Sequence, residues 1–170
     1  MTQLEWLTSE SPYDMLRHLD GKIKDEAFMK FSVKCCRRIW PILTDPRSRA
    51  VVEATEAYLS GNLSAADAAK INWDWNVADE AGEIQDSAGG SSNAAIESVC
   101  GLGEGHAQQV AIACRESSGI AASDLLRQAG CPQDIVIDAC KSAMSAEKVE
   151  QCNLLRELFR HHPGSLAEGA

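Results

Sequence analysis

The feature that most constrains the fold is the segment 28–43, in which apolar residues recur with the 3.6-residue period of an α-helix. They form two adjacent rows, so a helix over this segment can be covered by neighbours on two sides. The first row is Phe28, Phe31, Cys35, Ile39 and Leu43, and the second is Met29, Val33, Cys36 and Trp40. This pattern predicts the central helix of a small helical domain.

Every cation of this helix falls on the face that the apolar rows leave free. These residues, which we call the basic stripe, are Lys30, Lys34, Arg37 and Arg38. Close cations on a bare helix repel one another by about 0.2–0.5 kcal/mol per pair, so acids are expected opposite them. We therefore predict that at least one of Arg37 and Arg38 forms a salt bridge, or a hydrogen bond to a carbonyl, within the domain.

The chain of 170 residues has a formal net charge of −9, which argues against non-specific binding to nucleic acid or to anionic membranes. Residues 17–49 depart from this average, because they carry nine cations against four acids. Residues 50–92 carry eight acids and a single cation, so charge complementarity between neighbouring helices explains the asymmetry. A chain of this length can fold as one domain over residues 1–170 without disulfides or a structural metal.

Helix start and stop signals recur along the chain and predict an all-α fold, a single compact bundle of seven to nine short helices with non-parallel packing. Ser11 and Asp45 each place a capping side chain before a proline at the first helical position. Pro41 is expected to stop or kink the central helix. We expect the central helix to contact a third helix over about residues 46–60 and the last helix, over about 146–160.

The second half of the chain shows weaker helical patterns separated by small residues. They predict a helix over 104–116, a short helix capped by Ser123, another that begins at Pro132, and a last helix capped by Ser145. Residues 87–92 are all small, which predicts a flexible surface loop.

The chain has seven cysteines, no signal-peptide pattern at its start, and no apolar run near the ~18 residues of a membrane span. We therefore expect a cytoplasmic protein without a membrane partner, whose thiols are reduced and mostly buried. The adjacent pair Cys35 and Cys36 is the most unusual feature, because the neighbouring cations could lower a thiol pKa. Both sulfurs nevertheless lie on the apolar rows, which favours core packing.

No C-x-x-C, G-x-S-x-G, H-E-x-x-H or Walker pattern occurs in the sequence. The remaining cysteines and histidines lack the close ligand pairs of zinc sites. We therefore expect no catalytic residue, no metal site and no cofactor.

A series of motifs marks roughly the first 60 residues: Trp6-Leu7, Met15-Leu16, Gly21-Lys22, Cys35-Cys36-Arg37-Arg38-Ile39-Trp40 and Arg47-Ser48-Arg49. This block resembles the opening of an uncharacterised bacterial family associated with planctomycete genomes. Members of that family tend to end in a Leu-Arg-Asp-Ile-Phe motif and a Gly-Asn-Pro turn. Residues 154–159 are similar to the motif and residues 160–163 depart from the turn. The resemblance implies a family and no activity, because none is established for the group.

Two functional hypotheses follow. The leading one is a non-enzymatic helical protein-interaction module that docks on an acidic protein surface. Its candidate binding residues are Lys34, Arg37, Arg38, Arg47 and Arg49. The alternative is a small-molecule-binding or thiol-redox protein that uses Cys35 or Cys36 in a cleft between helices. The acidic total argues against nucleic acid as the partner of the same arginines.

Overall fold

The computed structural model describes residues 1–80, 96 and 101–160, and all regular secondary structure in these ranges is α-helical. The elements with assigned bounds are α1 (Gln3–Thr8), α2 (Pro12–Leu19), α3 (Asp25–Arg38), α4 (Pro46–Leu59), α5 (Ala65–Glu80), α7 (Glu104–Gln128) and α8 (Gln133–Leu158). The prediction of an all-α fold with seven to nine helices is therefore confirmed for the described part of the chain.

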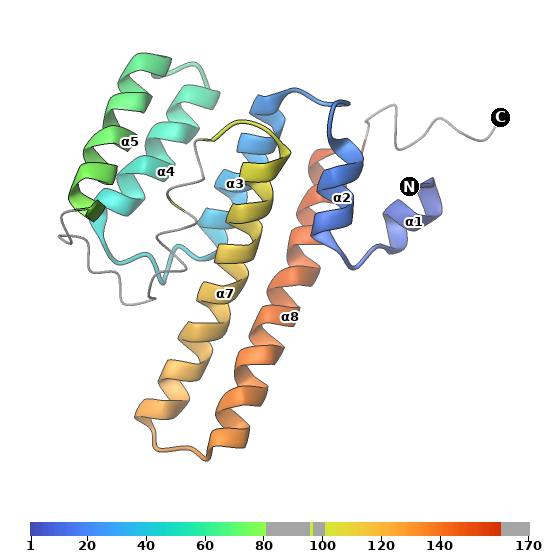
Figure 1. Cartoon of the computed structure of the whole chain (residues 1–170), viewed down its shortest axis with the longest axis vertical. Helices are drawn as coiled ribbons and strands as arrows, with labels where there is room; N and C mark the ends of the chain where they lie inside the picture. Colours follow the sequence, from blue (N-terminus) through green and yellow to red (C-terminus); the bar gives the residue numbers. More distant parts are fainter. Residues whose placement is uncertain (81–95, 97–100, 161–170) are drawn as a thin grey trace.

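α3 is the central helix, and it packs against α4, α7 and α8. Its apolar rows are buried from Phe28 and Phe31 near its start to Cys35 and Cys36 near its end. In Figure 1 the pair α4–α5 and the pair α1–α2 lie on opposite sides of the central helices. The predicted contacts of the central helix with the third and last predicted helices are confirmed.

Proline and its capping partners set the helix starts as the sequence predicts. The Ser11 hydroxyl accepts a hydrogen bond from a backbone N–H in the first turn of α2 (3.3 Å), and Pro12 is the first residue of that helix. The Asp45 carboxylate does the same for the backbone N–H of Arg47 (2.7 Å) at the start of α4. α3 ends at Arg38, before Pro41.

Two of the three expected breaks in the second half of the chain are wrong, whereas the break before the helix predicted to begin at Pro132 is confirmed, because α7 ends at Gln128 and α8 begins at Gln133. Four predicted helices merge into two, because α7 runs unbroken from Glu104 to Gln128 and α8 from Gln133 to Leu158. The positions read as caps lie inside these helices: the Ser123 hydroxyl donates to a carbonyl of its own helix (2.8 Å) and Ser145 is in the middle of α8. Small residues thus serve close packing between helices, and tertiary packing overrides the local stop signal.

Gly119 shows how closely α7 and α8 approach one another. A Cβ atom at this position would lie 2.6 Å from Met144 Cγ and 3.0 Å from Cys140 Sγ, so any larger residue would force the Met144 side chain to move. The two helices make the most extensive helix pair of the fold. Figure 1 shows that they form a hairpin whose far half extends beyond α2, α3 and α4.

The short helix α1 spans Gln3–Thr8 near the start of the chain. The Thr2 side chain and the Glu5 side chain cap each other's backbone N–H groups at its start. Arg156 of α8 donates hydrogen bonds to the carbonyl oxygens of Trp6 (3.3 Å) and Ser9, which ties α1 to the far end of the chain.

The loop predicted over residues 87–92 lies outside the described residues. None of the helices in the described ranges has the length and apolar character needed to cross a membrane.

Candidate interaction site

Arg37 joins α3 to α4. Its guanidinium donates two hydrogen bonds to the Glu56 carboxylate, one of them over 2.9 Å from Nε to Oε1. This bidentate pairing raises the pKa of Arg37 and lowers the pKa of Glu56. The same guanidinium lies 3.9 Å from the ring centroid of Trp40, which adds a cation–π contact.

Arg38 joins α3 to α8. Its Nε lies 3.0 Å from both carboxylate oxygens of Glu147, and a second nitrogen lies 3.5 Å from Glu150. The Glu147 side chain is only 7% exposed. Burial therefore raises the pKa of Glu147, although the charge and hydrogen bonds of Arg38 act in the opposite direction. The prediction that at least one of the two arginines is paired within the domain is confirmed for both.

Arg47 and Arg49 stabilise the connection between α3 and α4. Arg47 binds the carboxylate of Asp45 (3.0 Å) and holds the pKa of that group below its usual value. Arg49 donates to the carbonyl oxygens of Leu43 (2.6 Å) and Trp40 (3.1 Å), and its guanidinium lies 5.0 Å from the Trp40 ring. These contacts give both predicted binding residues a structural role in the turn.

The two lysines of the basic stripe are the cations with the weakest internal pairing. Lys34 lies 3.8 Å from Glu157 and remains 43% exposed. Lys30 is exposed and makes no ion pair with any residue that the structure describes. Lys30 was part of the predicted stripe but was left out of the candidate binding residues, although its i, i+4 spacing from Lys34 gave the signal.

A groove of about 780 Å³ runs beside these cations, between α3, α4 and α8. We call it the basic groove. Its cations are Lys30, Lys34, Arg37 and Arg38, its acid is Glu56, and its apolar lining consists of Val33, Leu59, Leu154 and Leu158. A second hollow, of about 560 Å³, shares Lys30 and Leu158 with it and extends the surface towards the start of α3. Neither is lined by Arg47 or Arg49.

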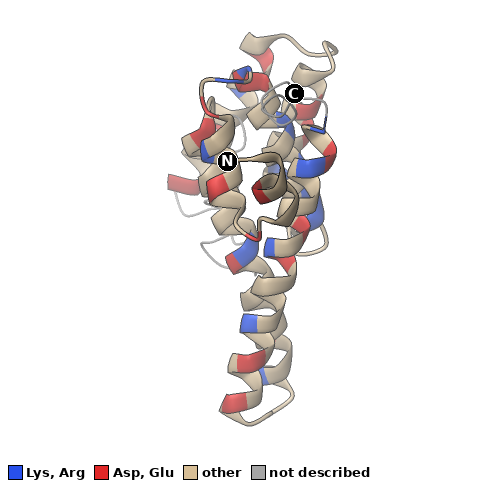
Figure 2. Ribbon diagram, turned by 90° about the vertical axis from the view of Figure 1, so that its right-hand side faces the viewer, with Lys and Arg blue, Asp and Glu red and all other residues tan. Residues whose placement is uncertain are grey.

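Figure 2 shows Lys and Arg positions among Asp and Glu positions over the wide end of the molecule. Arg37, Arg38 and Arg47, which the sequence offered as binding residues, are paired with acids of the same chain. Two lysines with little or no pairing, the exposed Lys30 and the partly exposed Lys34, remain beside the half-buried leucines of the groove.

The two adjacent cysteines belong to the core. Cys35 and Cys36 are fully buried, as is Cys114 of α7. Burial raises the pKa of the thiols of Cys35 and Cys114, and Cys114 is also affected by a hydrogen bond with Cys36. A thiol that is buried and protonated is a poor nucleophile. In the ranges that the structure describes, no three His, Cys, Asp or Glu side chains are grouped so that they could hold a metal ion.

A smaller hollow, of about 260 Å³, lies beside α4 and α5, away from both cysteines. Thr55, Tyr58 and Asn72 contribute its polar groups, and the buried side-chain oxygen of Asn72 has no hydrogen-bond partner among the residues that the structure describes. No sequence pattern pointed to this hollow, because Asn72 lies in a helix pattern without any binding motif.

The groove brings together cationic, acidic, hydroxyl and apolar side chains, with Ser60 as the hydroxyl, and this mixture suits non-covalent recognition. The chain matches no family model, curated protein or solved structure, so the resemblance carried by roughly its first 60 residues stays a prediction.

Proposed function

We propose that this chain is a non-enzymatic interaction module whose basic groove binds an acidic amphipathic helix of a partner protein. The observation that carries the proposal is the combination of the exposed Lys30 and the partly exposed Lys34 with the half-buried Leu59, Leu154 and Leu158 in one groove. An amphipathic helix lays its apolar face into such a groove, while its carboxylates meet the lysines at the edge.

The lysines and the leucines of the groove are expected to contribute differently to binding. Exposed ion pairs contribute about 0–1 kcal/mol each, so the two lysines supply orientation and association rate more than affinity. Most of the affinity must come from covering the leucines, at roughly 25 cal/mol per Å² of apolar surface. Arg37 and Arg38 are already paired, so they shape the groove more than they contact the partner.

The test uses a labelled synthetic peptide that forms a helix with leucines on one face and glutamates beside them. Fluorescence anisotropy measures its binding to the wild-type chain and to a Lys30→Glu/Lys34→Glu variant. The charge reversal should weaken binding at least tenfold, whereas the control Lys141→Glu, on an exposed part of α8, should leave it unchanged.

Amide chemical shifts give a second readout. Peptide binding should move signals from α3, α4 and α8 that line the basic groove and leave α5 unaffected. Equal binding by wild type and charge-reversed variant, or shifts confined to other helices, would refute the proposal.

A second candidate function, small-molecule binding, is favoured by the hollow beside Asn72 rather than by the cysteines. An apolar compound with one hydrogen-bond donor would satisfy the Asn72 oxygen. A fragment screen by thermal shift, repeated with an Asn72→Leu variant, tests it: stabilisation by such fragments should disappear in the variant. The cytoplasmic location and the exclusion of nucleic acid rest on the sequence arguments and belong to the same proposal.

A further inference from the structure

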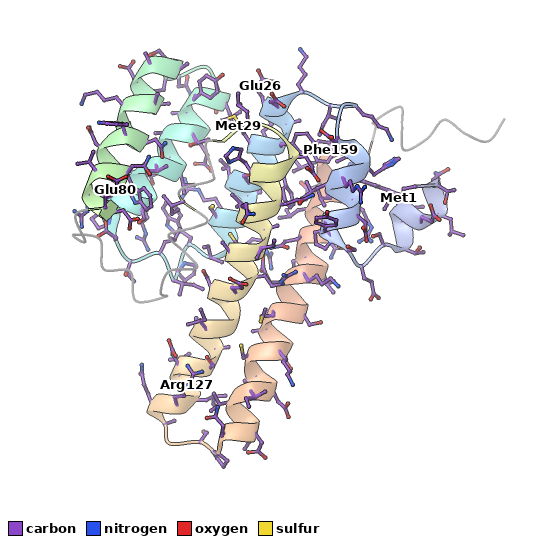
Figure 3. The ribbon with its side chains drawn as sticks, viewed as in Figure 1. Met1, Glu26, Met29, Glu80, Arg127 and Phe159 are labelled. Carbon is purple, nitrogen blue, oxygen red and sulfur yellow. The ribbon has the colours of Figure 1, made fainter. Side chains whose placement is uncertain are left out.

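Among the described helices, α2 and α3 cover only the near half of the α7–α8 hairpin, as Figure 1 shows. α3 ends at Arg38, which lies beside Glu147 and Glu150, and α7 continues well beyond this level. Figure 3 labels Arg127 near the hairpin tip, and in Figure 1 no other described helix reaches that end. No described helix besides α7 and α8 therefore accompanies the far half.

One face of this far half continues the face that α3 covers. On α8 the residues that pair with α3 include Glu150 and Glu157. Counting back from Glu150 at helical spacing, in steps of three or four residues, leads to Ala146, Ser142, Ala139 and Ile135. Because α3 ends at Arg38, beside Glu150, it does not cover the residues of this row that lie closer to the hairpin tip.

The corresponding row of α7 lies on the same side. Gly119 faces α8, as its close approach to Met144 and Cys140 shows, and Ser118 precedes it by one residue. Ala139 likewise precedes Cys140. Moving back by one residue turns a side chain by about 100° around its helix. Because α7 and α8 run in opposite directions, this step brings Ser118 and Ala139 to the same side of the hairpin.

We call this surface the tip face. It consists of Ser118, Ala122, Leu125 and Ala129 on α7 and Ile135, Ala139, Ser142 and Ala146 on α8. It contains no charged residue, whereas Asp124, Arg127 and Lys141 fall on the other side of the hairpin. Leu125 is 70% exposed and Ile135 is 48% exposed, so two large aliphatic side chains stand in water on a surface that elsewhere in the fold is covered.

We infer that the tip face is a dimer interface, on which the hairpin of a second copy of this chain packs antiparallel to form a four-helix bundle. The side-chain sizes are self-complementary for this arrangement. Leu125 and Ile135 lie towards the tip, and Ser118 and Ser142 lie towards the rest of the molecule. A two-fold axis across the hairpin near Ala122 places the large residues of each copy against the small residues of the other.

Two further observations favour a second copy. Each chain carries a net charge of −9, and the tip face is a surface on which two such chains can approach without bringing carboxylates together. A parallel arrangement would place both copies of α3 on the same side and make them collide. The antiparallel arrangement instead sets each hairpin tip at the end of the other copy's α3.

The size of the tip face sets the expected affinity. The tip face covers about 14 residues of each helix, which at 1.5 Å per residue makes it roughly 20 Å long. Two helices about 10 Å apart make it roughly 20 Å wide, so two copies together bury on the order of 1,000 Å². This is the lower end of specific interfaces, so we expect a dissociation constant in the micromolar range.

Sedimentation equilibrium of the full chain, from low to high micromolar concentration, tests the inference. Wild type should shift from monomer to dimer, and Leu125→Glu should raise the dissociation constant at least tenfold. Ile137→Glu is the matched control, because Ile137 is 42% exposed but lies on the other side of the hairpin. Circular dichroism should show unchanged helix content in both variants.

A charge-swap variant tests the antiparallel arrangement. Ser118→Lys/Leu125→Glu should restore the dimer, because the new lysine of one copy meets the new glutamate of the other across the two-fold axis. A wild-type chain that stays monomeric throughout, or equal weakening by Ile137→Glu, would overturn the dimer, and failure of the double variant to recover would overturn its antiparallel geometry. Monomeric wild type that binds an unrelated helical peptide through Leu125 would assign the tip face to another partner and equally refute the inference.

Discussion

Replacing Arg38 by methionine tests how α3 is attached to α8. The substitution keeps an apolar stem but leaves the carboxylate of Glu147, only 7% exposed, without its cation. Breaking a buried ion pair from one side costs about 3–5 kcal/mol, because the remaining charge stays desolvated. Arg38 itself is 34% exposed, so we expect the low end of that range, about 3 kcal/mol at pH 8.

The loss should depend on pH in a defined direction. Burial raises the pKa of Glu147 in the folded state, and Arg38 limits this rise. A carboxyl with a raised pKa binds its proton more tightly in the folded state than in the unfolded state. The free energy of unfolding therefore falls as the pH rises above the pKa that this carboxyl has in the unfolded state. Without Arg38 the pKa of Glu147 rises further, and protonation relieves the cost in acid. Arg38→Met should therefore destabilise the protein less at pH 5 than at pH 8.

Urea unfolding followed by circular dichroism measures both effects. With a slope of about 2 kcal/mol per M, the midpoint at pH 8 should fall by about 1.5 M. The double variant Arg38→Met/Glu147→Met is the control, since a buried ion pair replaced by apolar residues of similar size is often neutral or stabilising. An unchanged midpoint for Arg38→Met at pH 8, or a double variant as unstable as the single one, would refute the reasoning.

Three further outcomes are expected. Gly119→Ala should lower stability by about 1 kcal/mol because its Cβ would press on the facing helix, whereas Gly105→Ala, with open space around it, should be neutral or raise stability by about 0.5 kcal/mol in the same urea assay. Arg49→Lys should lower the free energy of unfolding by about 1–2 kcal/mol, measured by thermal unfolding. The planar guanidinium donates to the carbonyl oxygens of Leu43 and Trp40 from two different nitrogens, and a lysine ammonium has only one nitrogen. Cys35 should stay unmodified by iodoacetamide in the native protein while the partly exposed Cys131 reacts, as peptide mass spectrometry can show; early labelling of Cys35 would revive the thiol-redox hypothesis.

The first half of the fold could be predicted because its local signals agree with its packing. Ser11 and Asp45 cap the helices they precede, and the two apolar rows are buried along α3 as far as Cys35 and Cys36. In the second half the local signals and the packing conflict. Ser123 and Ser145 were interpreted as helix caps, but both lie inside the unbroken helices α7 and α8, where packing between the two helices decides.

The predicted break before residue 146 also prevented the prediction of Glu147 as the partner of Arg38. A last helix that began at residue 146 would place Glu147 in its first turn, where an acid needs no partner beyond the helix dipole. Only the unbroken α8 brings Glu147 under α3. Glu56 was easier to anticipate, because the turn after Pro41 brings α4 back along α3. Opposite charges could therefore be expected, but only the register of the long helices decides which acid meets which arginine.

The hydrogen bonds from Arg156 to the carbonyl oxygens of Trp6 and Ser9 have a consequence for the order of folding. They join residues up to 150 positions apart, and α3 in the first half packs on α7 and α8 in the second. During synthesis α1 to α5 leave the ribosome before those partners exist, so Phe28 and Phe31 have only a partial cover at that stage. The hairpin, by contrast, is built from neighbouring residues and can form as soon as it is made. The earliest residues of the chain are thus the ones that must wait longest for their final contacts.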